Sequence, residues 1–292
     1  MKRLAPWIVG LGAISYGIPA SLFKLAGRAG VQNGPLLFWS FLSSAVILTL
    51  VHVSRGNRLK TQGTSWRQVL LVMAAGTASG FTNTFYILAL RSIPVAVAAV
   101  MLMQSVWLSV LLGAMIKRQW PSRRQLLSII LVLAGTVLAA DLLPITTALS
   151  GWGLLFSFLA AVAYAGTLQF TASLGNNLEP LTKTWLLCVG ALGLIVVAWG
   201  PQLINVPFSL VAVKWGLLTA CFSMILPLAC YSRFMPLVPL GVGPILSSLE
   251  LPASIVVAFL LLGERVSWLQ LVGVIVIISA VIFANRPGIK LK

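Results

Sequence analysis

The chain has 292 residues, of which 59% are hydrophobic and only 8% charged, and its formal net charge is +16. Typical soluble domains carry roughly a quarter charged residues, so this composition excludes an ordinary water-soluble core. The positive charge does not indicate nucleic acid, because the basic residues stand in short loops between apolar runs and form no basic face or base-stacking module.

Apolar runs of about 20 residues recur along the chain, the length a helix needs to cross a hydrocarbon core of about 30 Å. The fifth run is the least defined, because Asp141 and Pro144 cut it short. The sequence therefore predicts an all-α integral membrane protein with ten transmembrane helices, near 6–26, 35–53, 67–90, 94–116, 124–140, 151–174, 182–201, 214–235, 240–262 and 266–284.

The first run also has features of a cleaved signal peptide, since Lys2 and Arg3 precede an apolar stretch that ends in small residues near Ala20 and Ser21. The stretch is long for a signal core, and cleavage would remove a helix that has a counterpart later in the chain. We expect a retained span.

The distribution of basic residues predicts the orientation. An even number of spans puts both termini on one side, and the positive-inside rule selects the cytoplasm of a multi-pass cell-membrane protein. With that choice the inner side holds 15 of the 20 Lys and Arg residues: Lys2, Arg3, Arg55, Arg58, Lys60, Arg67, Lys117, Arg118, Arg123, Arg124, Lys183, Arg233, Arg286, Lys290 and Lys292. The outer side holds Lys24, Arg28, Arg91, Lys214 and Arg265.

An internal repeat appears when the chain is shifted against itself by 145 residues. The shift pairs Trp7 with Trp152, Gly30 with Gly175, Pro35 with Pro180, Tyr86 with Tyr231, Pro94 with Pro239 and Gln125 with Gln270. It predicts five-helix repeats at 6–140 and 151–284 and a cytoplasmic basic tail at 285–292. Because five is odd, the second repeat is inverted, an arrangement typical of secondary transporters. A duplication kept for packing alone is the alternative.

Three segments resemble the drug/metabolite transporter superfamily in its EamA-like branch. They are Ser247-Ser248-Leu249-Glu250-Leu251-Pro252, Leu260-Leu261-Leu262-Gly263-Glu264-Arg265 and Leu269-Gln270-Leu271-Val272-Gly273, and in the first half the likeness continues through 86–96, 125–127 and 134–135. The resemblance implies ten helices, a central cavity and movement of a small metabolite or drug, commonly outward. Glu264 pairs with Gln119 at the repeat shift, so the first half lacks the family's acidic turn residue.

Polar side chains at membrane depth are the candidates for substrate contact, because an unpaired polar group in hydrocarbon costs several kcal/mol. Ser79 and Asn83 share a helical face with Gly76 and Gly80, a pattern that also serves close helix packing. The substrate-binding candidates are Tyr16, Asn83, Tyr86, Gln104, Tyr164, Gln169 and Tyr231.

Glu250 is the candidate coupling residue. It lies ten residues into the ninth predicted helix, roughly 15 Å deep, where a carboxylate costs at least about 2.5 kcal/mol. Such a group faces a wet cavity, pairs with a cation or stays protonated. The first half has Gln104 at nearly the equivalent place, so the acid is one-sided. A local hydrogen bond to Ser247 or Ser254 is the structural alternative.

No catalytic set, cofactor motif or metal site is visible, because the acids are dispersed, His52 is the sole histidine and the cysteines lack C-x-x-C spacing. We therefore expect a non-enzymatic secondary transporter that moves a small metabolite, amino-acid-like compound or drug by alternating access, as an exporter coupled to protons. Its partners are a small-molecule substrate and the lipid bilayer, not nucleic acid. An importer, a lipid-carrier flippase and a non-transporting scaffold remain alternatives, and the substrate and oligomeric state stay open.

Overall fold

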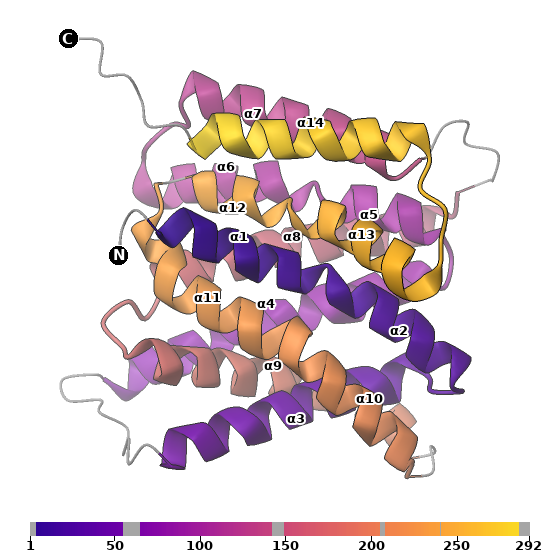
Figure 1. Cartoon of the computed structure of the whole chain (residues 1–292). Helices are drawn as coiled ribbons and strands as arrows, with labels where there is room; N and C mark the ends of the chain where they lie inside the picture. Colours follow the sequence, from indigo (N-terminus) through magenta and orange to yellow (C-terminus); the bar gives the residue numbers. More distant parts are fainter. Residues whose placement is uncertain (1–3, 55–64, 142–148, 205–207, 240, 286–292) are drawn as a thin grey trace.

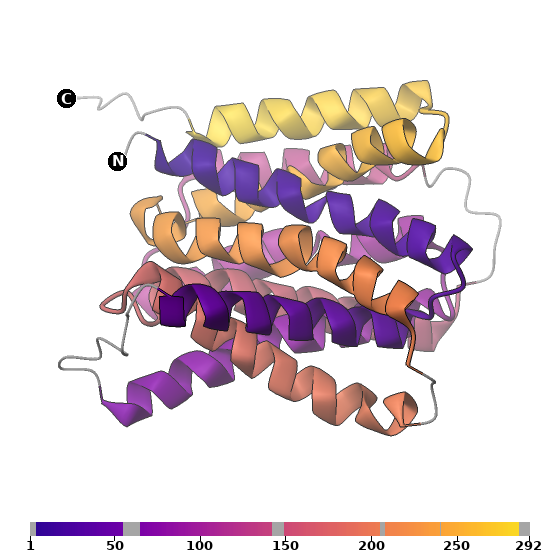
Figure 2. The same ribbon diagram turned by 60° about the horizontal axis from the view of Figure 1, so that its bottom comes forward.

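The computed structural model describes residues 4–54, 65–141, 149–204, 208–239 and 241–285, and every regular element in these ranges is helical. The helices lie alongside one another in one bundle, with the start of the first helix and the end of the last helix at the same end (Figures 1 and 2). They are α1 (Ala5–Tyr16), α2 (Ile18–Arg28), α3 (Asn33–Ser54), α4 (Trp66–Leu90), α5 (Val95–Leu102), α6 (Ser105–Lys117), α7 (Arg123–Ala139), α8 (Gly151–Ser173), α9 (Pro180–Leu203), α10 (Leu210–Ala220), the π-helix η1 (Cys221–Ile225), α11 (Leu226–Phe234), the 3-10 helix η2 (Met235–Leu237), α12 (Val242–Ser247), α13 (Glu250–Leu262) and α14 (Trp268–Asn285). The predicted all-α class is confirmed.

Adjacent elements combine into longer rods, such as α1 with α2 and α12 with α13. In the described residues, eight of the resulting helices are long and apolar enough to cross a membrane. α4 and the 17-residue α7 are not among these eight. The count of ten spans therefore stays a prediction, although the helix bounds follow the ten predicted ranges to within four residues. The predicted tail lies outside the described residues, apart from Asn285.

Matching caps begin the last helix of each repeat. The Gln125 backbone N–H donates to Ser122 Oγ, and the Ser122 N–H donates to Gln125 Oε1 over 2.8 Å. Ser267 and Gln270, each 145 residues later, make the same reciprocal pair at 3.0 and 3.2 Å. This capping box satisfies two backbone donors at a helix start. The two repeats therefore share the hydrogen bonds that begin α7 and α14.

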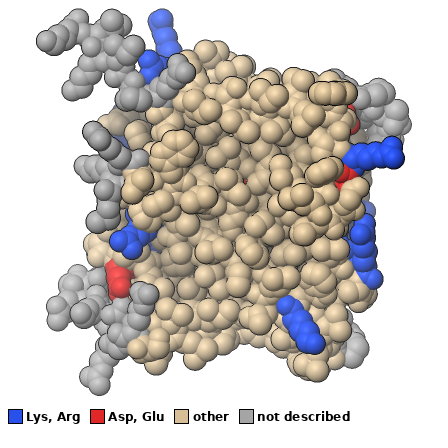
Figure 3. All heavy atoms as spheres, viewed as in Figure 1, with Lys and Arg blue, Asp and Glu red and all other residues tan. Residues whose placement is uncertain are grey.

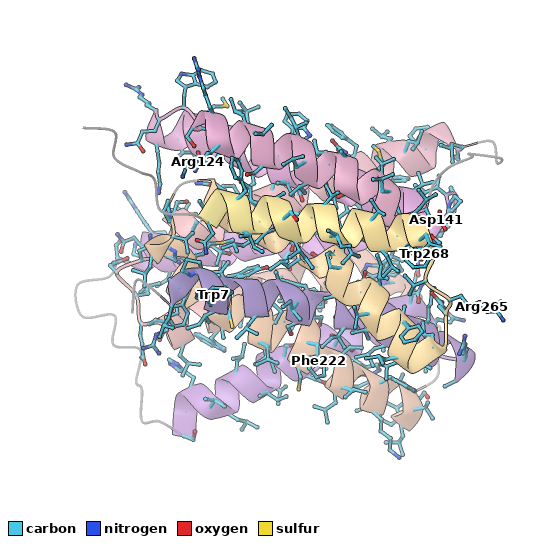
Figure 4. The ribbon with its side chains drawn as sticks, turned by 45° about the horizontal axis from the view of Figure 1, so that its top comes forward. Trp7, Arg124, Asp141, Phe222, Arg265 and Trp268 are labelled. Carbon is cyan, nitrogen blue, oxygen red and sulfur yellow. The ribbon has the colours of Figure 1, made fainter. Side chains whose placement is uncertain are left out.

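The last helices of the two predicted repeats, α7 and α14, run in opposite directions. In Figure 4, Arg124 marks the start of α7 at one end of the bundle, whereas Trp268, at the start of α14, lies at the other end near Asp141. These repeat-related helices pack against each other and are therefore antiparallel. The inversion of the whole five-helix repeats stays a prediction.

The bundle presents an apolar belt between two charged ends. On the face shown in Figure 3, Lys and Arg residues lie at two opposite edges, with a broad uncharged surface between them. Large apolar side chains are exposed on the outside of the bundle. The exposed fraction is 77% for Val197, 69% for Leu260 and 63% for Ile275. A patch of this extent is unfavourable in water and favourable in lipid.

Helices of the first repeat pack mainly on helices of the second. α4 lies against α8 and α9, α7 against α14, and α3 against α9 and α10. The closest approach joins α4 to α9, where a Cβ atom added at Gly190 would collide with the Met73 carbonyl oxygen and one added at Gly76 would collide with that of Leu187. Only glycine permits this backbone contact.

Candidate functional site

Glu250 stands at a break in the rod predicted as the ninth span. α12 ends at Ser247 and α13 begins at Glu250, which is half-buried. The residue lies 8 positions after the start of α12 and 12 before the end of α13. At 1.5 Å per residue these separations are roughly 12 and 18 Å, so the carboxyl group lies near the middle of the rod.

The carboxylate is held by a tyrosine from another helix. The Tyr164 hydroxyl on α8 donates to Glu250 Oε2 over 2.9 Å. The two serines named as local alternatives bond elsewhere: Ser247 Oγ donates to the Pro244 carbonyl and Ser254 Oγ to the Leu251 carbonyl. In the described part of the chain, the ion pair recorded is Lys24 with Glu264, so Glu250 has no cationic partner there.

All four tyrosines of the chain lie in or against the apolar cluster that contains the neighbours of Glu250, Leu249 and Leu251. The Tyr16 ring contacts those of Tyr164 and Tyr231 at centroid distances of 6.0 and 5.9 Å. We call Glu250 and the four tyrosines, from α1, α4, α8 and α11, the tyrosine cluster.

Helix breaks surround the tyrosine cluster. α5 ends at Leu102, 145 residues before the end of α12, and α6 begins at Ser105, 145 residues before the start of α13. A third break, at Gly17 between α1 and α2, lies directly on the start of α13. A Cβ atom added at Gly17 would approach the Glu250 carbonyl oxygen and the Ser254 nitrogen to 2.6 Å. Sequence reasoning did not single out this glycine, because its role depends on a contact with a distant segment.

Gln104 takes part in local bonding instead of facing Glu250. Its Nε2 donates to the Val100 carbonyl over 3.3 Å, and its Oε1 accepts from Trp107 Nε1 over 2.9 Å. The position that matches Glu250 in the repeat is Ser105, which is fully buried and whose hydroxyl has no partner in the described residues. The acid is thus one-sided, as the sequence indicated.

Asn83 and Gln169 are the remaining candidates. Asn83 Nδ2 donates to the Ser79 carbonyl one turn earlier, whereas the buried Gln169 has no recorded partner for its Nε2 among the described residues. On the same face of α4, Gly76 and Gly80 pack against α9. These small residues therefore serve helix packing, which was the alternative weighed for that face.

Lys183 was counted with the charges of the inner loops, but it is 1% exposed. Its Nζ donates to the Thr171 carbonyl over 2.6 Å and to Asn176 Oδ1 over 2.8 Å. It therefore ties the end of α8 to the start of α9, a role that only the folded connection reveals. Among the described residues, no three His, Cys, Asp or Glu side chains come together as a metal site.

Comparisons with known proteins agree with this architecture. The model of the EamA-like transporter family matches residues 4–140 and again 151–286. No curated protein sequence gives a significant match. Among similar solved structures is one described as "Crystal structure of protein", with 15% identity and a TM-score of 0.78 over 96% of this chain and 97% of the other. At that identity the likeness concerns the fold alone.

Proposed function

This chain belongs to the EamA-like transporter family, a membrane transporter family of the drug/metabolite transporter superfamily, and from that premise we propose that it exports a small amine-bearing metabolite, amino-acid-like compound or drug in exchange for protons. The proposal places it in the cytoplasmic membrane as a secondary transporter working by alternating access. The tyrosine cluster is its substrate and coupling site.

The observation that carries the proposal is the environment of Glu250. A carboxylate near the middle of a membrane-spanning rod is costly by about 2.5 kcal/mol or more unless a cation neutralises it. No Lys or Arg within the described residues pairs with it, and its recorded hydrogen-bond donor is the neutral Tyr164. A proton or a substrate ammonium group would supply the missing charge.

Because the proton and the substrate ammonium group compete for the Glu250 carboxylate, proton entry is coupled to substrate export. When an ammonium group binds the ionised Glu250, the proton that occupied the carboxyl group has left, and the reverse exchange returns it on the other side. Aromatic faces attract cations by about 0.5 to 2 kcal/mol, so the surrounding tyrosines would add to substrate binding.

The helix breaks provide a means of switching sides. Residues at breaks between helical segments absorb changes in backbone angles, and the breaks at 103–104, 248–249 and Gly17 lie beside or at the level of the carboxyl group. Movement there would open the cluster toward either end of the bundle while Glu250 keeps its place.

The test is a transport screen in proteoliposomes over amino acids, nucleosides, sugars and cationic drugs, with and without a pH gradient. We expect gradient-driven accumulation of an amine-bearing compound and its loss in Glu250→Gln, which keeps size and polarity but binds no proton. Asp141→Asn is the matched control, because Asp141 is exposed and amidation at this surface site should leave accumulation unchanged. Wild-type accumulation by Glu250→Gln would refute the proposal.

A further inference from the structure

A cavity of about 340 Å³ lies between α3, α4 and α9, apart from the tyrosine cluster. Its lining includes Asn33 and Gly34 at the start of α3. α3 begins at the end of the bundle opposite the start of α1 (Figure 1). The residues that matter for its chemistry are Gln32, Asn33, Gly34, Arg91, Trp199 and Gln202. Its volume is within the range of small-molecule sites.

Arg91 stacks on the ring of Trp199, which is itself held in place by its neighbours. Its guanidinium carbon lies 5.7 Å from the centroid of the Trp199 ring. That ring is 3% exposed, donates from Nε1 to Thr84 Oγ1 over 3.2 Å, and packs so closely on Gly34 that an added Cβ atom would come to 2.7 Å. Stacking uses the face of the guanidinium group and leaves its N–H edges free for a ligand.

The polar side chains around the cavity are solvent-exposed, and apart from the stacking of Arg91 on Trp199 they make no recorded side-chain contact within the described residues. In the described residues, no side-chain hydrogen bond or ion pair is recorded for Arg91, Gln32, Asn33 or Gln202, and no acidic residue lines the cavity. One permanent positive charge and three amide groups thus surround a hollow without a counter-charge. A phosphate oxyanion is a ligand that complements such a set, because a guanidinium group binds two of its oxygens through parallel hydrogen bonds.

We propose that this cavity binds the phosphate oxyanion of a small molecule or of a lipid headgroup. α3 and α4 belong to the first repeat and α9 to the second, so the bound anion would bridge the repeats and stabilise their present arrangement. The same chemistry is found in a soluble phosphate ester and in the headgroup of an anionic lipid, and the site lies near a predicted membrane surface where both are available.

Thermal unfolding of the purified full chain distinguishes the sources. One arm titrates glycerol 3-phosphate, with glycerol as the uncharged control, in detergent. The other compares nanodiscs of phosphatidylcholine with nanodiscs containing phosphatidylglycerol. A soluble ligand predicts a saturable rise of Tm in the first arm, and a lipid headgroup predicts a rise only in the second.

Arg91→Gln should weaken either response by about tenfold or more, the loss expected for a charge-assisted hydrogen bond. Arg91→Lys should recover part of it, since the charge remains. Lys214→Gln removes an exposed charge from α10, outside the cavity, and should respond like wild type. Should neither probe raise Tm, or should Arg91→Gln respond as strongly as Lys214→Gln, the site does not exist.

Discussion

Ser105 and Glu250 occupy the same position in the two repeats, each as the first residue after the break in a discontinuous helix. One side chain is a fully buried hydroxyl without a recorded partner, and the other is a half-buried acid bonded to Tyr164. At this equivalent position after the helix break, the first repeat thus carries a hydroxyl group and the second repeat a carboxyl group.

Ser105→Ala should therefore leave transport unchanged and alter the free energy of unfolding by no more than about 1 kcal/mol, because no hydrogen bond in the described residues is lost. Transport assays and thermal unfolding in detergent measure the two effects. A loss of transport as large as that of Glu250→Gln would show that both repeats contribute equivalent groups.

Tyr164→Phe removes the hydroxyl that donates to Glu250 and keeps the ring. A hydrogen bond to a charged group contributes about 1.5 to 3 kcal/mol, so we expect transport to fall about tenfold or more with expression intact. The initial rate in proteoliposomes is the measurement. An unchanged rate would mean that the bond does not matter to transport.

Tyr86 and Tyr231, paired by the repeat, should each affect substrate affinity. Tyr86→Ala and Tyr231→Ala are expected to raise KM about tenfold, within the range of an aromatic contact to a cation. Tyr231 is 0% exposed, so Tyr231→Phe is needed as a control that keeps the packing. Unaltered substrate affinity in both alanine variants, with normal elution as folded protein, would rule out a binding role.

Gly190→Ala should destabilise the bundle by about 1 to 3 kcal/mol, the typical cost of overpacking, because its Cβ atom would collide with the Met73 carbonyl. Gly193→Ala is the control on the same helix, where nothing lies within 4 Å of the added atom. It should be neutral or stabilising, since alanine favours the helix. Equal Tm values for the two variants would disprove the close packing of α4 on α9.

The orientation predicted from the 15-to-5 charge split places the loops of Arg58 and Arg118 in the cytoplasm and that of Thr146 outside. Positions 58 and 146 lie outside the described residues, and labelling reaches them directly. In a cysteine-free background, an impermeant thiol reagent added to intact cells should label Thr146→Cys and spare Arg58→Cys. The opposite pattern would reverse the topology.

Hydropathy was enough to predict the helix bounds, because each rod is one apolar run between polar turns. It did not reveal the breaks at 103–104 and 248–249, because each falls inside one long apolar run in which single polar residues such as Gln104 and Ser248 do not mark a helix end. It nominated the tyrosines and Glu250 one by one, but their convergence depends on how α1, α8 and α13 pack. The burial of Lys183 was equally hidden, because a lysine near a helix end is usually exposed.

The packing of α4 on α9, and of α7 on α14, has a consequence during synthesis. The first five rods are complete before residue 141, yet their main partners come from residues after 150. Until those partners are inserted, glycine faces such as that of Gly76 have only lipid beside them. A ribosome stalled midway would thus leave a half-protein whose glycine faces lack the helices that they pack against in the full chain.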